Sequence, residues 1–258
     1  MHRVKPKNLS KIILSDSLTE WYRDREEVKH KTDRDLLLSD PFYRFIRIIN
    51  LLDNNIPVNE LTNSHCLDLG CGPGNFASII TKIFNLNMVA VDQWDLDKQI
   101  SNIPFSYIDM NIANDWPFEY KSFDLVSALE VIEHMVDTDS FLKKVYKILK
   151  PGGYFILTTP NINCLRNRLM IPLGKYPVPM EYKNVIHHVR LYNRNLLEKH
   201  LNEYNFKIIK TIGVSFLKEK HNRYKILKYI SEKIADKFPQ FCNNIITIAK
   251  KKRESQVT

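Results

Sequence analysis

The sequence predicts an α/β fold in which a mostly parallel sheet carries helices on both faces. Short apolar stretches typical of buried strands alternate with helix-like stretches from residue 62 to residue 252. Three of the seven glycines in the chain, Gly70, Gly72 and Gly74, directly follow the first of these strands. A strand that enters a glycine turn and then a helix is how such sheets make a nucleotide-sized crevice.

The segment before the first strand is predicted to be helical. Apolar residues recur at helical intervals across residues 17–52, and Ser39-Asp40-Pro41 is a helix-start signal with the proline at the first position. We interpret residues 1–60 as a helical cap or lid, not as a separate domain. The whole chain, residues 1–258, is then one predicted domain with its core at 61–252.

Acidic residues stand at the ends of the next predicted strands. The second strand, residues 88–92, ends in Asp92, 22 residues after Gly70. A carboxylate at that distance is placed to accept ribose hydroxyls in nucleotide sites. The third strand runs into Asp109, and the fourth runs into Glu130. The remaining predicted elements are a fifth strand at 149–157, a helix at 194–201, a sixth strand at 206–214 and a reversed last strand at 245–249.

The glycine turn reads G-x-G-x-G with Asp68 two residues ahead of it. Its third glycine comes one residue too early for the dinucleotide fingerprint G-x-G-x-x-G. Together with the ordered strands and acids, the turn resembles the S-adenosylmethionine (SAM) site of class I SAM-dependent methyltransferases. The resemblance implies a Rossmann-like sheet of seven strands with an antiparallel last strand, and SAM as the cofactor. The SAM-binding residues that it implies are Asp68, Gly70, Gly72, Gly74, Asn75, Phe76, Asp92, Gln93, Trp94, Asp109, Met110, Leu129 and Glu130.

A second group of polar residues follows the fourth strand. Methylation of an oxygen requires that the hydroxyl lose its proton or that a metal lower its pKa. We expect Glu130, Glu133 and His134 to share one helical face, and two carboxylates with an imidazole suit a divalent metal. This E-x-x-E-H pattern resembles small-RNA 2′-O-methyltransferases and ubiquinone-biosynthesis O-methyltransferases, two metal-dependent groups. The metal ligands that it implies are Glu130, Glu133, His134 and His187, with His188 as the other choice for the fourth.

Two other interpretations of this group stay open. Without a metal, the catalytic residues are His134, His188 and Glu133, with a histidine as the base. Acids in a first helical turn are also favoured by the helix dipole whatever the function.

Residues 161–192 form a long irregular insert, which is predicted to contact the substrate. The insert ends in H-x-R-x-Y, in which Arg190 and Tyr192 either orient the substrate or only pack. Its basic residues make a modest phosphate track at best, and they include Arg166, Arg168 and Lys175.

Charge is concentrated near the C-terminus. The net charge is +9, and residues 218–258 hold 11 basic and 4 acidic residues. A helix within 218–238 either makes a peripheral contact with an anionic membrane or packs on the sheet, and we favour packing. No apolar run approaches about 18 residues, and the four cysteines have no pairing pattern. We therefore expect a cytoplasmic protein without a transmembrane segment.

These patterns predict an enzyme, a methyltransferase that moves a methyl group from SAM to a hydroxyl of a small molecule, a glycan or a lipid-linked precursor. One alternative is metal-dependent 2′-O-methylation of RNA ends, with Mg²⁺ or another divalent ion as a second cofactor and nucleic acid as the partner. A second alternative is a catalytically silent SAM-fold protein that binds a partner through its cap and its basic C-terminal helix.

Overall fold

Seven strands form one mixed sheet in the order β3-β2-β1-β4-β5-β7-β6. This confirms the predicted fold class, including the reversed last strand. The computed structural model describes residues 6–15, 32, 37, 41–93, 102–112, 114–177, 187–214 and 225–253, without the side chains of 6–8, 10 and 225–230. The chain divides into two compact units, Met1–Ile108 and Asp109–Thr258. The strands are β1 (His65–Leu69), β2 (Asn87–Asp92), β3 (Phe105–Tyr107), β4 (Phe123–Leu129), β5 (Leu149–Pro160), β6 (Phe206–Val214) and β7 (Asn244–Lys251).

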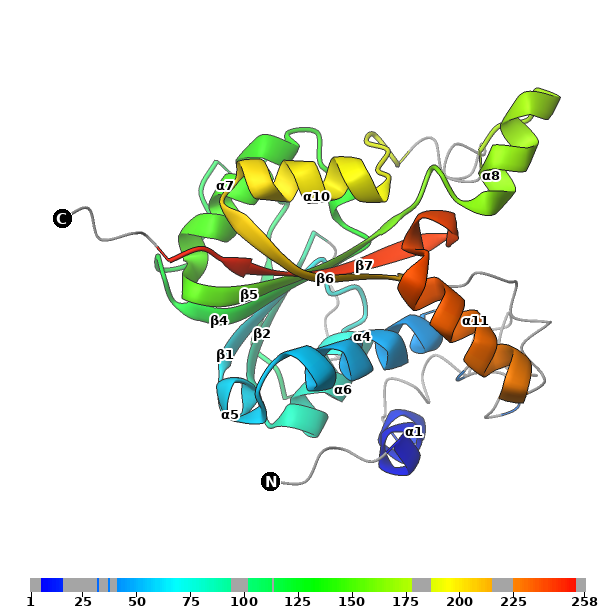
Figure 1. Cartoon of the computed structure of the whole chain (residues 1–258). Helices are drawn as coiled ribbons and strands as arrows, with labels where there is room; N and C mark the ends of the chain where they lie inside the picture. The colour runs from blue at the N-terminus through cyan, green and yellow to red at the C-terminus, as the bar shows by residue number, and fades with distance from the viewer. Residues whose placement is uncertain are drawn as a thin grey trace. The chain divides into compact units, whose positions relative to one another are not determined.

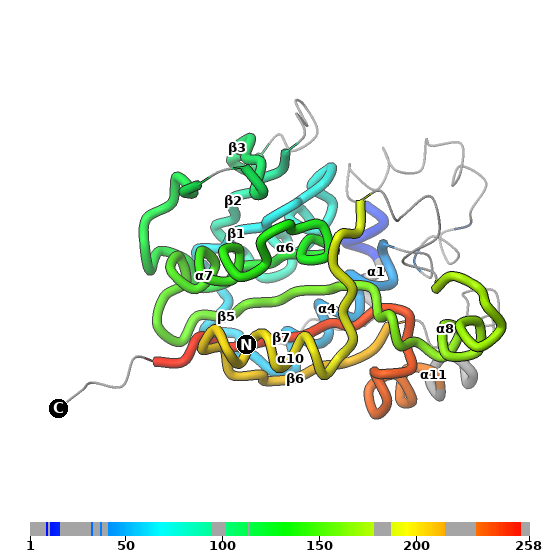
Figure 2. Tube along the Cα trace, turned by 90° about the horizontal axis from the view of Figure 1, so that it is seen from above, coloured from blue at the N-terminus to red at the C-terminus, as the bar shows by residue number. Residues whose placement is uncertain are grey.

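Among the described residues, the first unit contains three parallel strands and four helices. Strand β2 pairs in parallel with β1 on one side and with β3 on the other, as Figure 2 shows. The Phe45 ring packs against the Phe76 ring with centroids 5.3 Å apart, which joins α4 (Phe42–Asn55) to α6 (Asn75–Phe84). Of the predicted helix-start signal only Pro41 is described, and most of the predicted helix at 17–52 lies outside the described residues. The helices are α1 (Pro6–Leu14), α4 (Phe42–Asn55), α5 (Val58–Leu61) and α6 (Asn75–Phe84).

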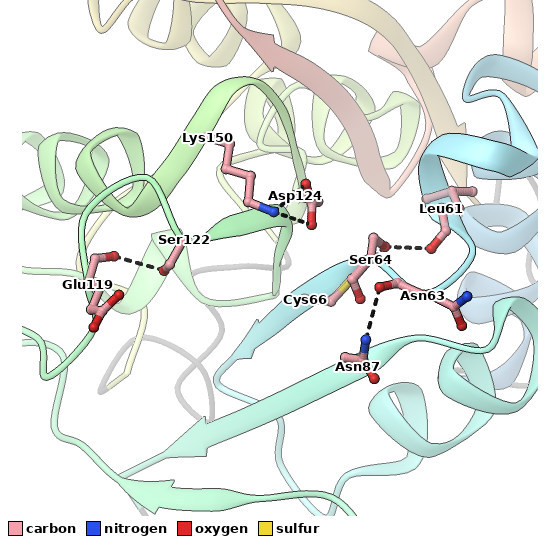
Figure 3. Close-up of polar contacts among 9 residues, drawn as sticks. All are labelled: Leu61, Asn63, Ser64, Cys66, Asn87, Glu119, Ser122, Asp124 and Lys150. Carbon is pink, nitrogen blue, oxygen red and sulfur yellow. Dashed lines mark hydrogen bonds and ion pairs between the residues drawn. The ribbon is translucent and has the colours of Figure 1, made fainter.

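Short polar contacts fix where β1 and β2 begin. The Ser64 hydroxyl donates to the Leu61 carbonyl at 2.5 Å, and the Asn87 amide donates to the Asn63 carbonyl at 2.9 Å (Figure 3). The two strands are therefore in register from their first residues. Their carboxyl ends carry Asp68 and Asp92 toward one edge of the sheet.

The second unit contains the four remaining strands. Strand β5 runs parallel to β4 and antiparallel to β7, and β7 is also antiparallel to β6. The Lys150 ammonium binds both carboxylate oxygens of Asp124 at 2.8 Å, at the amino ends of β4 and β5 (Figure 3). Its described α-helices are α7 (Thr138–Ile148), α8 (Leu165–Met170), α10 (Arg194–Glu203) and α11 (Lys225–Lys237). Its described 3₁₀ helices are η1 (Ile132–His134), η2 (Ile171–Leu173) and η5 (Pro239–Phe241).

Helices cover both faces of the sheet in this unit. Figure 1 shows α7 and α10 on one side of strands β5, β6 and β7, and α11 on the other. Both α10 and α11 contact β6, and α11 buries Ser231 and Ala235. These contacts agree with the packing interpretation of the basic helix, although residues 218–224 lie outside the described residues. Within the described part of the chain, no helix combines the length and apolarity needed to cross a bilayer.

Gly213 in β6 lies directly against Cys242, and this contact yields a stability prediction. A Cβ atom at Gly213 would overlap the Cys242 Sγ and lie 2.6 Å from its Cβ. Because such overpacking forces backbone shifts, we expect Gly213→Ala to lower the free energy of unfolding by about 2 kcal/mol. Urea unfolding measures the change. The double variant Gly213→Ala, Cys242→Gly should lose less stability than the two single variants together, and full additivity would contradict the contact.

Candidate active site

The glycine turn after β1 is held against the end of β2. The amides of Gly70 and Cys71 both donate to the Val91 carbonyl, at 2.9 and 3.0 Å. Gly72 and Gly74 have φ angles of 54° and 84°, a region that favours glycine. The Gly72 amide donates to the Asp92 Oδ2 at 2.8 Å. The acid predicted from its spacing therefore lies directly beside the turn.

Two buried carboxylates make this turn electronegative. Asp68 is 2% exposed and Asp92 is 6% exposed. Burial raises the pKa of the Cys71 thiol, and the negative charges of Asp68 and Asp92 raise it further. A region that disfavours a thiolate in this way suits a cation, and SAM carries a sulfonium and an ammonium group.

A buried donor opens the helix that follows the turn. Asn75 is the first residue of α6, and its side chain is 4% exposed. Its Nδ2 has no hydrogen-bond partner within the described residues. A buried donor in this state costs about 1–3 kcal/mol until an acceptor arrives. A Cβ at Gly72 would meet no described atom within 4 Å. Space beside the turn, a waiting donor and two carboxylates fit the methionine and ribose groups of SAM.

The other residues expected at this site differ in their surroundings. Phe76 is buried against Phe45, so its ring serves helix packing. Gln93 is exposed, and Trp94 lies outside the described residues. In the second unit, the Asp109 Oδ1 accepts from the Asn111 amide at 2.9 Å. Met110 and Leu129 are half-buried.

The raised pKa of Cys71 gives a second prediction. Since the thiol stays protonated at neutral pH, iodoacetamide should not label Cys71 in the folded protein. Mass spectrometry of tryptic peptides should find the label there only after unfolding in urea. Rapid labelling of folded protein would show that the turn is open and the thiol ionised.

Glu130 directly follows β4, and its carboxylate is hydrogen-bonded to two neighbouring strands. Its backbone has a positive φ of 55°, which is uncommon outside glycine. Its carboxylate accepts from the Thr158 hydroxyl at 2.7 Å and from the Asn244 amide at 2.8 Å. This side chain therefore joins the ends of β4, β5 and β7.

A segment that we call the strap, residues 187–192, lies along η1. The amides of Val189 and Arg190 both donate to the Glu133 carbonyl, at 2.9 and 3.0 Å. The His134 Nδ1 bonds to the His187 carbonyl at 2.7 Å. Because a carbonyl only accepts, Nδ1 carries the proton and Nε2 is left to bind a metal or a proton. The end of the irregular insert is thus hydrogen-bonded to η1.

The strap brings His188 to Glu133 and His134. One ligand atom from each of these three side chains lies within 4.8 Å of the others. The rings of His134 and His188 have centroids 4.9 Å apart, and Glu133 is 1% exposed. A buried carboxylate beside two imidazoles suits Zn²⁺, Mn²⁺ or a similar ion. The bond from His134 to a carbonyl is the support that metal-binding histidines commonly have.

The cluster differs from the ligand set that the sequence implied, and which of the two sets holds a metal stays a prediction. Among the described residues, the cluster contains Glu133, His134 and His188, without Glu130 or His187. Glu133 and His134 lie in a 3₁₀ turn, and the left-handed backbone at Glu130 turns the chain just before it. Glu130 consequently does not share a helical face with them. The His187 side chain is exposed, and the contact of this residue with His134 is the hydrogen bond from the His134 Nδ1 to its backbone carbonyl.

A comparison with known protein families identifies the family of this chain. A family model described as a methyltransferase domain matches residues 39–211, more than half of the chain. The chain belongs to this methyltransferase-domain family.

Among curated relatives, this methyltransferase-domain chain is 32% identical over 112 residues to a ubiquinone biosynthesis O-methyltransferase of Rickettsia bellii. The match covers 40% of this chain and 45% of the relative, so the chain spans about half the length of that curated protein.

Solved structures agree on the fold of the methyltransferase domain. A SAM-dependent methyltransferase from Thermotoga maritima superposes with a TM-score of 0.57 at 16% identity, over 93% of this chain and 98% of that one. Phosphoethanolamine N-methyltransferase 2 of Haemonchus contortus, solved with SAM, gives 0.55 at 19% identity, over 81% and 52%. At these identities the likeness shows the fold alone.

Proposed function

We propose that this chain is a metal-assisted O-methyltransferase that uses SAM to methylate a hydroxyl group of a small molecule. The observation that carries the proposal is the cluster of buried Glu133 with half-buried His134 and His188, whose ligand atoms lie within 4.8 Å of one another. An amine acceptor is already nucleophilic once neutral, whereas a hydroxyl needs its proton removed or its pKa lowered. Such a cluster is therefore most useful to an oxygen acceptor.

The first unit supplies the groups that hold the cofactor. Asp68 is suited to the ammonium of the methionine part, and the Asn75 amide is suited to its carboxylate at the start of α6. Asp92 accepts from the Gly72 amide through Oδ2, and its negative charge beside the glycine turn is suited to the ribose hydroxyls. When bound, SAM supplies the electrophilic methyl carbon, and the task of the protein is alignment.

The second unit supplies the groups that act on the acceptor. Glu133, His134 and His188 would hold a divalent ion, which lowers the pKa of a hydroxyl that it binds. The bond from the His134 Nδ1 to the His187 carbonyl fixes the ring, so that Nε2 is the nitrogen that would bind the ion. The burial of Glu133 excludes water from one side of the cluster. The strap sets the position of His188, so it decides whether the third ligand is present.

Two observations favour a small acceptor over RNA. Arg168, a residue of the expected phosphate track, is committed to other contacts. Its guanidinium stacks on the Phe241 ring at 4.6 Å, and its Nε donates to the Asn163 carbonyl at 2.7 Å. In addition, the curated relative from Rickettsia bellii is named for ubiquinone biosynthesis, in which the methyl acceptor is a small molecule.

Labelled methyl transfer tests the proposal. The protein is incubated with methyl-tritiated SAM and Mg²⁺ or Mn²⁺, together with a catechol, a simple phenol, a sugar, a primary amine or a short RNA. We expect label on the phenolic acceptors, loss of transfer with EDTA and recovery when metal is restored. Transfer to the amine that EDTA leaves unchanged would overturn the proposal. Calorimetry without heat from SAM would instead indicate a silent binding protein.

A further inference from the structure

A chain of three polar side chains lies behind the strap, away from the cluster itself. The Tyr192 hydroxyl lies 3.1 Å from the His200 Nδ1, and the His200 Nε2 lies 2.8 Å from the Asp139 Oδ1. These residues come from three places in the sequence: the end of the strap, helix α10 and the first turn of α7. Tyr192 is 4% exposed, and its ring is stacked on that of His200. The Tyr192 end of this series of hydrogen bonds is therefore buried within the protein and not at its surface.

The chemistry of the three groups fixes the direction of the hydrogen bonds. A carboxylate only accepts, so the His200 Nε2 carries the proton and donates to Asp139. In the neutral ring Nδ1 then accepts, and the Tyr192 hydroxyl donates to it. The bond from His200 also lowers the pKa of Asp139, which keeps the acceptor charged. Each group therefore orients the next.

Both ends of this chain of bonds lead to the cluster. Helix α7 starts four residues after His134, so Asp139 belongs to the same stretch as η1. Tyr192 ends the strap that carries His188, and its backbone carbonyl accepts from the Ile162 amide at 2.9 Å. Asn161 bridges to Tyr192 and is itself fixed by its side-chain amide to the carbonyls of Gln240 and Cys242, at 3.0 and 2.8 Å. The strap is therefore held along its length.

We propose that Tyr192, His200 and Asp139 form a clamp that positions His188 against Glu133 and His134. These three are positioning residues, because they act through the strap and do not belong to the cluster. The inference rests on the proposed function for its purpose, but the geometry that it describes can be measured without any acceptor. Asp139 is 61% exposed at its side chain and His200 only 13%, so the inner link is the stronger one.

Hydrogen exchange at the strap tests the clamp directly. In Tyr192→Phe and His200→Gln, the amides of Val189 and Arg190 should exchange about tenfold faster, because local opening costs less without the inner bond. Asp139→Asn should produce a smaller increase. The amide of Ile156 in the central sheet should be unchanged, which separates a loosened strap from a destabilised fold. Glu198→Gln is the matched control, since it breaks the Arg194–Glu198 ion pair of α10 and leaves the clamp intact.

Two further measurements, the tautomer of His134 and the affinity for Mn²⁺, test whether the clamp positions the cluster. Long-range ¹⁵N NMR should show the His134 ring with its proton on Nδ1 in the parent protein and a mixture of tautomers in Tyr192→Phe. Mn²⁺ affinity should fall about tenfold in the same variant, as it does when outer partners of metal ligands are removed. Unchanged exchange at Val189 with an unchanged His134 tautomer would overturn the clamp. If the parent protein binds no Mn²⁺, the proposed function fails, and the exchange and tautomer data still decide the clamp.

Discussion

Asp92→Asn should weaken SAM binding by about 10- to 150-fold, because it removes the charge from hydrogen bonds worth about 1.5–3 kcal/mol. The asparagine keeps a carbonyl oxygen that can accept from the Gly72 amide, so the turn should keep its shape. What it loses is the negative charge that strengthens a bond from a ribose hydroxyl. Isothermal calorimetry with SAM measures the change in dissociation constant.

The control for Asp92→Asn is Asp124→Asn. It also removes one carboxylate, but from an ion pair with Lys150 at the amino ends of β4 and β5. We expect the SAM affinity of this control to equal that of the parent protein. An unchanged dissociation constant in Asp92→Asn would remove Asp92 from the cofactor site, whatever the control shows.

Glu133→Gln should lower the affinity for Mn²⁺ by more than about 100-fold, since losing a direct ligand costs more than losing an outer partner. Glutamine fills the same space at this buried position, so the fold should survive. Titration followed by electron paramagnetic resonance counts free Mn²⁺ and gives the affinity. SAM affinity should be unchanged, because the residues proposed to hold SAM in the first unit are intact.

Two matched pairs decide which ligand set is right. Glu130→Gln should keep Mn²⁺ affinity, because the Glu130 carboxylate is bound by Thr158 and Asn244. His188→Gln should lose Mn²⁺ affinity. His187→Gln should keep it, since His187 contacts His134 through its carbonyl and not through its ring. A loss in Glu130→Gln as large as that in Glu133→Gln would restore the ligand set expected from the E-x-x-E-H pattern.

The sequence predicted the sheet well because buried parallel strands leave a strong apolar pattern. Each of the seven expected strands overlaps an observed one. Asp92 accepts from the Gly72 amide, and its expected contact with the ribose stays a prediction. The buried donor on Asn75 could not be seen in this way, since its isolation depends on what surrounds it in three dimensions.

In the second half of the site the backbone differs from the expected helical turn, for a local reason. The E-x-x-E-H pattern looks helical, but a left-handed residue at Glu130 and a 3₁₀ turn at Ile132–His134 replace the expected helical turn. The choice between two adjacent histidines depended on backbone bonds from Val189 and Arg190. No side-chain pattern encodes such bonds. The contact of His200 with Tyr192 and Asp139 likewise joins residues far apart in the sequence.

The strap is attached to Glu133 through main-chain amides, and this has a consequence for which side chains the strap can tolerate. Val189 is 45% exposed, and its amide bond to the Glu133 carbonyl does not depend on the side chain that it carries. Substitutions at this position can therefore change an exposed side chain while the main-chain bond that holds His188 beside Glu133 and His134 is kept.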